Sequence, residues 1–267
     1  MCTLILGRDV LGTGTMVLAA NRDEDPARPS DPPRVLHDDP LVAGGRDRIA
    51  GGTWLAVRAD AAVALLNRPA ALGLGTAPAP DTSPPAAALR SRGLLVLDVA
   101  TLPTPAGALS TAARERALAR AAREYALGAV RSIRYAPLSL VFATAASSWV
   151  LAWDGENAAV QDLAPGWHVL THADLDDREE PRTRRLLREL DGWTPGDFDV
   201  ARRGLTSRLA SHEVPRVCLH EGRAQTVSFA LVYLGVPGVR YLHGDGRPCE
   251  CGAIDHTNLV EERSTSV

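Results

Sequence analysis

Residues 1–25 read MCTLILGRDVLGTGTMVLAANRDED. Two apolar runs in this stretch, Cys2–Leu6 and Thr15–Ala20, flank a turn rich in glycine, and this pattern predicts a hairpin of two strands. The second run stops at the polar cluster Asn21–Asp25, after which we expect a proline-rich coil through Pro33. Polar residues directly after a buried strand lie at the end of a sheet, where binding and catalytic sites often form.

A second predicted hairpin ends in the same way. Gly51-Gly52-Thr53 opens a strand over Trp54–Val57, and the chain returns as a strand over Ala61–Leu66. That strand ends in the polar pair Asn67-Arg68. The sequence therefore predicts two polar clusters at strand ends, and both are candidates for a functional site.

The remaining pattern favours an α+β fold. Strands at both ends of the chain with helices between them predict sheets packed together with helices outside. A parallel doubly wound fold fits poorly because hairpins outnumber strand–helix–strand units, and the G-x-G-x-x-G signature of dinucleotide binding is absent. We expect a surface loop over 69–85, helices over 110–126, 178–190 and 197–211 (the last two arginine-rich and external), and strands over 138–144, 149–153, 158–163, 167–170, 216–220, 226–234 and 239–243.

Composition limits the classes of function. With 29 basic and 32 acidic residues, the net charge of −3 gives no general attraction for nucleic acid. All the basic residues are arginine, and the absence of lysine excludes a lysine Schiff base and a P-loop lysine. No apolar run approaches the roughly 18 residues of a membrane span, and the first twenty residues lack a secretion signal. We expect a cytoplasmic protein with a single domain over residues 1–267.

A second set of cysteines and histidines lies near the C-terminus. The polar tail from about residue 249, which we expect to be mobile, opens with Cys249-Glu250-Cys251, between His243 and His256. A C-x-C pair lacks the C-x₂₋₄-C spacing usual in structural zinc sites, so no metal site is predicted. Cys218 and His220 could join such a group only if the fold brought them close, and a buried strand explains Cys218 equally well.

Cys2 directly follows the initiator methionine. Aminopeptidases generally remove that methionine when the second residue is small, which would leave Cys2 as the first residue. One residue would then hold a thiol nucleophile and an amine that titrates at about 7.7 to 8.0, close enough to neutrality to act as a base. Because the chain has no lysine, this would be its only aliphatic amine. The position alone also fits a small apolar residue in a buried strand.

Six short motifs occur in order over the first seventy residues: Cys2-Thr3-Leu4, Asn21-Arg22-Asp23-Glu24, Arg28-Pro29-Ser30, Ala43-Gly44-Gly45-Arg46-Asp47, Gly51-Gly52-Thr53-Trp54-Leu55 and Asn67-Arg68. Together they resemble the NRDE family, which is also called the transport-and-Golgi-organisation protein 2 family. The resemblance thins to scattered motifs as far as about Leu234.

The NRDE family is in turn similar to the N-terminal-nucleophile (Ntn) hydrolases, especially the cysteine branch that contains penicillin V acylase and bile salt hydrolase. This resemblance implies a four-layer αββα sandwich, in which an arginine and an acid after the second strand hold the cysteine and its amine. Arg22 and Asp23 match best, with Glu24 or Asp25 competing for the acid role. A nearby guanidinium favours the thiolate and a carboxylate positions the amine. A solvated polar turn or a salt-bridge pair is the structural alternative.

The resemblance also implies an oxyanion hole. Asn67 resembles the asparagine that ends a strand and donates to the oxyanion, although it could simply cap a turn. His172 stands where the hydrolase branch has a second asparagine; it could donate an N–H or cap the helix that follows. Arg223 resembles a further active-site arginine, or it is a surface turn residue. The residues expected to contact the substrate are Glu24, Trp54 and Arg68.

The leading hypothesis is an N-terminal cysteine enzyme that hydrolyses or transfers an acyl group at an amide-type bond of a small molecule, without a cofactor. The scattered arginines suit a ligand with a carboxylate. The alternative is a protein of the same fold that binds haem or a lipid without bond cleavage, since the family has been linked to both. A domain whose site has decayed is a third hypothesis. Association into a homo-oligomer stays open.

Overall fold

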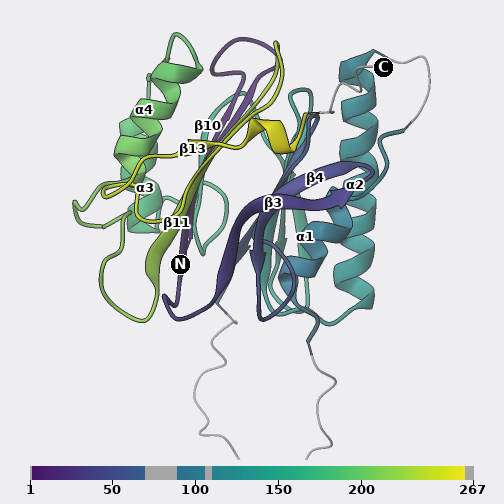
Figure 1. Cartoon of the computed structure of the whole chain (residues 1–267), viewed down its shortest axis with the longest axis horizontal. Coiled ribbons are helices and arrows are strands. Elements are labelled where there is room, and N and C mark those ends of the chain that lie inside the picture. Colours follow the sequence, from purple (N-terminus) through teal and green to yellow (C-terminus); the bar gives the residue numbers. More distant parts are fainter. Residues whose placement is uncertain (1, 70–88, 106–109, 262–267) are drawn as a thin grey trace, which may run out of the picture.

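The computed structural model describes residues 2–69, 89–105 and 110–261. These residues form an α+β protein with two antiparallel sheets and four helices. Figure 1 shows one pair of helices in green and the other in teal on opposite sides of the molecule, with the strands between them. Almost all of the surface loop that we expected over 69–85 lies outside the described residues.

The first sheet has six strands and contains the N-terminal hairpin. The predicted pairing of the first two strands is confirmed, with Leu4 opposite Ala20. A later strand pairs with the other edge of the first one, with Leu4 opposite Leu170. The order in this sheet is β10 (Gly166–Leu170), β1 (Thr3–Arg8), β2 (Met16–Glu24), β11 (Gln225–Leu234), β12 (Arg240–Gly244) and β13 (Ile254–Asp255).

The second sheet has seven strands that follow one another in chain order. The second predicted hairpin is confirmed, with Leu55 opposite Ala64. Its last three strands form the expected meander, but the chain then crosses to the first sheet as β10. The strands are β3 (Ser30–Asp38), β4 (Leu41–Asp47), β5 (Leu55–Val57), β6 (Ala62–Asn67), β7 (Leu138–Ala143), β8 (Ser148–Trp153) and β9 (Ala158–Asp162).

The central strands of each sheet are buried on both faces. Leu4 and Leu6 of β1 pack in a core between the two sheets, while Ile5 between them packs against helices. Because alternate side chains of a strand point to opposite faces, a continuous apolar run is what a strand between two layers requires. The helices are α1 (Arg92–Ala100) and α2 (Thr111–Ser132) on the seven-stranded sheet, α3 (Pro181–Leu190) and α4 (Phe198–Leu209) on the six-stranded sheet, and the short 3₁₀ helix η1 (Thr257–Leu259).

Two expectations about residues 21–33 are wrong. Asn21–Glu24 do not follow the second strand but form its last four residues, since β11 pairs with them as far as Glu24. The proline-rich segment is not a coil, because Pro32 and Pro33 lie in β3. β3 is the edge strand of its sheet and its pairing is irregular between Asp31 and Arg34, and an edge strand tolerates prolines that donate no hydrogen bond.

Other expectations fail where tertiary contacts override local pattern. Helix α1 was not predicted, and the segment 216–220 is a loop rather than a strand. Helix α3 is not wholly external, because Arg182 and Arg185 are each only 7% exposed. The segment from 249 packs as far as the described residues extend, since β13 pairs with β12 and Val260 is buried between the sheets.

Two close contacts bring the polar strand ends together. A Cβ on Gly52 would lie 2.3 Å from the carbonyl carbon of Gly93, so the absence of a side chain lets the start of α1 approach the turn before β5. The register that places Leu4 opposite Leu170 also places the residues after β10 beside the start of β1. No helix in the described part of the chain has the length and apolarity that crossing a bilayer requires.

Candidate functional site

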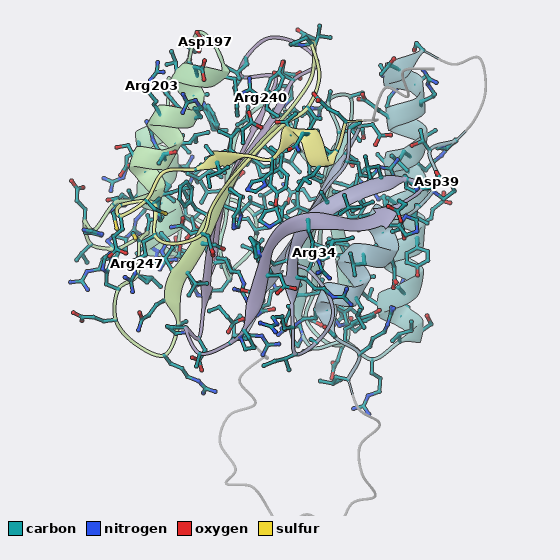
Figure 2. The ribbon with its side chains drawn as sticks, in the orientation of Figure 1. Arg34, Asp39, Asp197, Arg203, Arg240 and Arg247 are labelled. Carbon is teal, nitrogen blue, oxygen red and sulfur yellow. The ribbon has the colours of Figure 1, made fainter. Side chains whose placement is uncertain are left out.

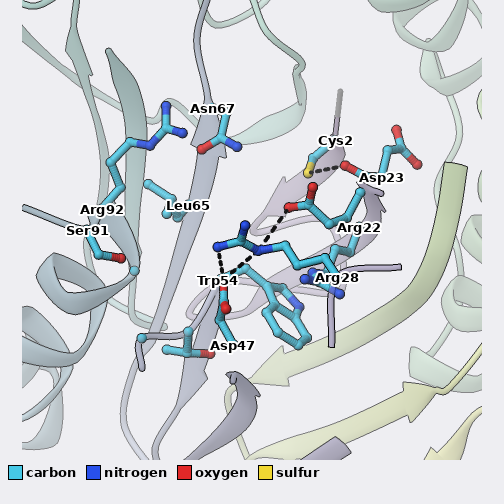
Figure 3. A pocket seen from close by; sticks show the side chains of 14 residues that line it. Cys2, Arg22, Asp23, Arg28, Asp47, Trp54, Leu65, Asn67, Ser91 and Arg92 are labelled. Carbon is cyan, nitrogen blue, oxygen red and sulfur yellow. Dashed lines mark hydrogen bonds and ion pairs between the residues drawn. The ribbon is translucent and has the colours of Figure 1, made fainter. Parts of the chain in front are cut away.

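A cavity of about 240 Å³ opens between the two sheets at the start of β1. Figure 3 shows Cys2 and Asp23 on one side of it and Asn67 and Arg92 on the other. Both predicted polar clusters therefore reach one cavity. Its lining residues are Cys2, Arg22, Asp23, Glu24, Arg28, Asp47, Gly52, Thr53, Trp54, Leu65, Asn67, Ser91, Arg92 and Gly93.

The Cys2 thiol lies at the wall of this cavity and is half-buried. Its Sγ is 4.0 Å from the backbone carbonyl oxygen of Asp23. Burial raises the pKa of the Cys2 thiol and the Asp23 carboxylate raises it further, while Arg22 acts in the opposite direction. Arg22 thus favours the thiolate as expected, but burial and the nearby carboxylate outweigh the guanidinium and leave the pKa of the Cys2 thiol raised.

Asp23 lies on β2, buried beside Cys2. Its two carboxylate oxygens have different surroundings. Oδ1 accepts a hydrogen bond of 2.7 Å from the Thr226 hydroxyl on β11. Oδ2 lies 3.8 Å from Nη1 of Arg182 and has no hydrogen-bond partner among the described residues. Burial raises the pKa of Asp23 to about 6, although the Thr226 hydroxyl and Arg182 lower it. A buried oxygen without a donor is a place where an amine or a substrate N–H can bind.

The raised pKa of Asp23 predicts a pH-dependent stability. The folded chain holds this proton to about pH 6, whereas the ordinary value is 3.8, so ionisation of Asp23 destabilises the fold. From about pH 4 to about pH 6 the free energy of unfolding should fall by up to about 3 kcal/mol through this group. Urea unfolding of the wild type and of Asp23→Asn across this range measures it. The same pH dependence of stability in both proteins would show that Asp23 is not the group responsible.

Arg22 faces the cavity from β2. Its guanidinium carbon lies 4.0 Å from the ring centre of Trp54, and its Nη1 donates to the Ser30 hydroxyl at 3.1 Å. A guanidinium stacked on an indole is held in orientation while its remaining N–H groups stay available to a ligand. Trp54, expected to contact the substrate, thus lines the cavity and also supports Arg22.

Sequence reasoning missed three charged residues of the cavity. Arg28 donates two hydrogen bonds to Asp47, of 2.7 and 2.9 Å, and lies 3.9 Å from Glu24. Arg92, the first residue of α1, donates to the Pro137 carbonyl at 2.8 Å. Arg28 and Asp47 belong to motifs quoted above, and this could have indicated them. Arg92 follows a segment without any recognised motif.

Asn67 is the last residue of β6, and its side chain is exposed at the cavity. His172 and Arg68 line an adjoining depression with Cys2, Asp23 and Asn67. Arg68 donates to the Ala173 carbonyl at 3.2 Å and pairs with Asp174 at 2.5 Å, so it fixes the loop that carries His172. His172 does not cap the next helix. The residue that caps the N-terminus of α3 is Glu180, whose side chain accepts a hydrogen bond from the Thr183 N–H.

Arg223 is not part of this cavity. It lines a separate depression with Glu24, Asp25 and Arg28, so the structure does not bring it to Cys2. The residue that approaches instead is Arg182 of α3, which donates to the Thr3 hydroxyl at 2.9 Å and lies beside Asp23. No local signal distinguishes Arg182 from the other arginines of its helix, because only packing against β1 buries it.

Comparison with known proteins accords with the motifs at the N-terminus. No curated protein matches the chain significantly. The model of the family described as Transport and Golgi organisation 2 (TANGO2), the family that the NRDE motifs indicated, matches residues 1–213. This match spans most of the chain and includes every residue that lines the cavity. The chain belongs to the Transport and Golgi organisation 2 family.

Proposed function

We propose that the chain, after loss of Met1, is an N-terminal cysteine enzyme that hydrolyses or transfers an acyl group at an amide-type bond. The observation that carries the proposal is the buried Oδ2 of Asp23, which accepts no hydrogen bond from any described residue and lies beside Cys2 at the wall of a cavity. A carboxylate in this position would accept a hydrogen bond from a free amine on Cys2 and orient it toward the thiol.

The raised pKa of the Cys2 thiol suits this chemistry. A neutral thiol must lose its proton as it attacks, and the amine of the same residue would take that proton. The sulfur forms a bond to the carbonyl carbon, and the amine returns the proton to the leaving nitrogen as the amide bond breaks. Water or an amine then attacks the thioester, which releases the acyl group and restores the thiol.

Asn67 and His172 would stabilise the oxyanion. Both adjoin Cys2 in the same depression, and an N–H donor directed at developing negative charge suits acyl transfer. The fold supports this proposal, since two sheets with a pair of helices on each outer face are the layers expected of an Ntn-type sandwich. In that arrangement Cys2, the residue directly before β1, lies at the cavity between the sheets.

We infer further that the substrate carries an anionic group. Arg28 is paired with Asp47, but neither Arg22 nor Arg92 forms an ion pair with any described residue. Two guanidinium groups without carboxylate partners among the described residues, one on β2 and one at the start of α1, face one cavity and fit a carboxylate or a similar anion.

The N-terminus tests the proposal directly. Intact mass shows whether Met1 is absent, and 2-cyanobenzothiazole condenses only with a cysteine that carries a free amine. Because the chain has no lysine, an amine reagent also has one aliphatic amine to label. We expect loss of Met1 and one benzothiazole adduct per chain, at Cys2. A chain that keeps Met1 in its native host would contradict the enzymatic proposal.

The same preparation tests the alternative of a haem carrier. Mixing with haem would give a Soret band that changes in Cys2→Ala or His172→Ala, without formation of an acyl-enzyme. A band of this kind, in a protein whose Cys2 no activated ester acylates, would favour binding over catalysis.

A further inference from the structure

A second group of reactive side chains lies outside the cavity, on the side of the six-stranded sheet that α3 and α4 cover. His212, Cys218, His220 and Cys249 each place one ligand atom within 4.8 Å of the other three. The first three lie in the loop between α4 and β11, and Cys249 lies in the turn after β12. Figure 2 labels Arg247, which belongs to the same turn as Cys249.

The distances among three of the four ligand atoms are close to those between the ligands of a tetrahedral zinc ion. The two sulfurs are 3.5 Å apart, and Nε2 of His220 lies 3.7 Å from Cys218 Sγ and 3.2 Å from Cys249 Sγ. Zinc bonds of about 2.3 Å to sulfur and about 2.0 Å to nitrogen place tetrahedral ligands about 3.3 to 3.8 Å apart, and each of the three separations is within about 0.4 Å of its expected value. The His212 ring meets the His220 ring edge-on, with centres 4.7 Å apart.

The outer surroundings of the group are also those of a metal site. The second ring nitrogen of His220, Nδ1, lies 3.7 Å from a carboxylate oxygen of Glu250. Histidine ligands commonly direct their other ring nitrogen to a carboxylate in this way, which orients the ring toward the metal. Glu250 is itself held by Arg247 at 3.0 Å.

The donor atoms of the group suit zinc. Thiolates and imidazoles are the ligands that zinc prefers, and each thiol loses its proton when the ion binds. Cys249 and His212 are exposed, so an ion can enter from solvent.

We propose that His212, Cys218, His220 and Cys249 bind one zinc ion, which ties the loop after α4 to the turn after β12. Four protein ligands leave no open position, so the site is structural rather than catalytic. The C-terminal group considered from the sequence differs: Cys251 Sγ donates to the Arg247 carbonyl, and His243 and His256 contact each other with ring centres 6.2 Å apart.

Two hydrogen bonds connect this group to the wall of the cavity. Leu219 lies between two of the ligands, and its N–H donates to the Thr226 hydroxyl at 2.9 Å. That hydroxyl donates in turn to Asp23 Oδ1 at 2.7 Å. Fixing the loop therefore holds the Thr226 side chain in the position from which it binds Asp23, so the zinc ion would stabilise the cavity wall from outside.

Metal content of untagged, reduced protein tests the proposal. We expect about one zinc per chain in the wild type. The zinc content of Cys249→Ser should be lower by more than about tenfold. Cys249 is exposed, so its replacement should leave the fold intact. Cys251→Ser is the matched control, because this neighbouring thiol lies outside the group, and it should keep the metal. Cobalt(II) should give the strong visible bands of a tetrahedral thiolate site in the wild type and in Cys251→Ser only.

Thermal unfolding gives a second readout. A chelator should lower the Tm of the wild type and of Cys251→Ser and leave that of Cys249→Ser unchanged, because metal binding contributes directly to folding stability. The proposal is overturned if reduced wild-type protein binds neither zinc nor cobalt, or if Cys251→Ser loses the metal as Cys249→Ser does. A disulfide between Cys218 and Cys249 in protein isolated from its native host would overturn it as well.

Discussion

Replacement of Cys2 by alanine should remove acyl transfer completely. The sulfur forms the covalent bond in the proposed mechanism, and loss of a nucleophile typically lowers kcat by at least about 10⁴-fold. With 4-nitrophenyl acetate as the probe, the wild type should release nitrophenol in a burst and carry one acetyl group, mapped to Cys2. Cys2→Ala should show neither, while Cys251→Ser, which replaces a half-buried thiol outside the cavity, should behave as the wild type.

A second variant separates the thiol from the amine. One glycine inserted between Met1 and Cys2 keeps the sulfur but places the chain terminus a residue further away. If the amine of Cys2 is the base, this variant should lose activity nearly as fully as Cys2→Ala, because a peptide nitrogen cannot accept the proton. Wild-type turnover in the extended chain would refute the amine as base and leave a simple thiol nucleophile.

Replacement of Asn67 by alanine should lower kcat by about 10² to 10³-fold, the usual effect of losing one oxyanion donor. Asn67 is exposed, and its side chain bonds to no described residue, so the free energy of unfolding should hardly change. Because the interaction forms only as negative charge develops, KM should stay near the wild-type value. Steady-state turnover of 4-nitrophenyl acetate and urea unfolding measure the two quantities.

The control for this variant is Asn258→Ala, which replaces another exposed asparagine that does not line the cavity. It should leave both kcat and stability unchanged. A wild-type kcat in Asn67→Ala would remove this residue from the site. A fall in the free energy of unfolding together with kcat would show that Asn67 caps the turn at the end of β6 rather than donating a hydrogen bond to the oxyanion.

Local pattern was sufficient for most of the strands and for the arginine-rich helices. The apolar runs of the first hairpin predicted β1 and β2, and the turn predicted at Asp154-Gly155 does fall between β8 and β9, within a loop of four residues. Local pattern failed for β3, whose prolines are tolerated because the strand lies at a sheet edge. It failed again over 216–220, where an apolar segment lies in the loop that contributes Cys218 and His220.

Most of the candidate site was also predictable from motifs. Cys2, Arg22, Asp23 and Asn67 meet at one cavity as the sequence predicts. Arg182 was not predictable, because its burial comes from packing of α3 against the first sheet. The net direction in which the pKa of Cys2 shifts was not predictable either. Arg22 lowers this pKa as expected, but burial, which depends on the packed fold, raises it more.

By itself, the sequence determined most of the strands, the polar clusters that end two of them, the absence of lysine and the family. These properties depend on side chains a few residues apart, where the alternation of a strand and the geometry of a turn act directly. Only the tertiary structure decided that Arg223 lies apart, that Arg182 reaches Asp23, and that Cys249 meets Cys218. Contacts between distant segments depend on which strands pair and how the sheets stack, and no local pattern encodes those choices.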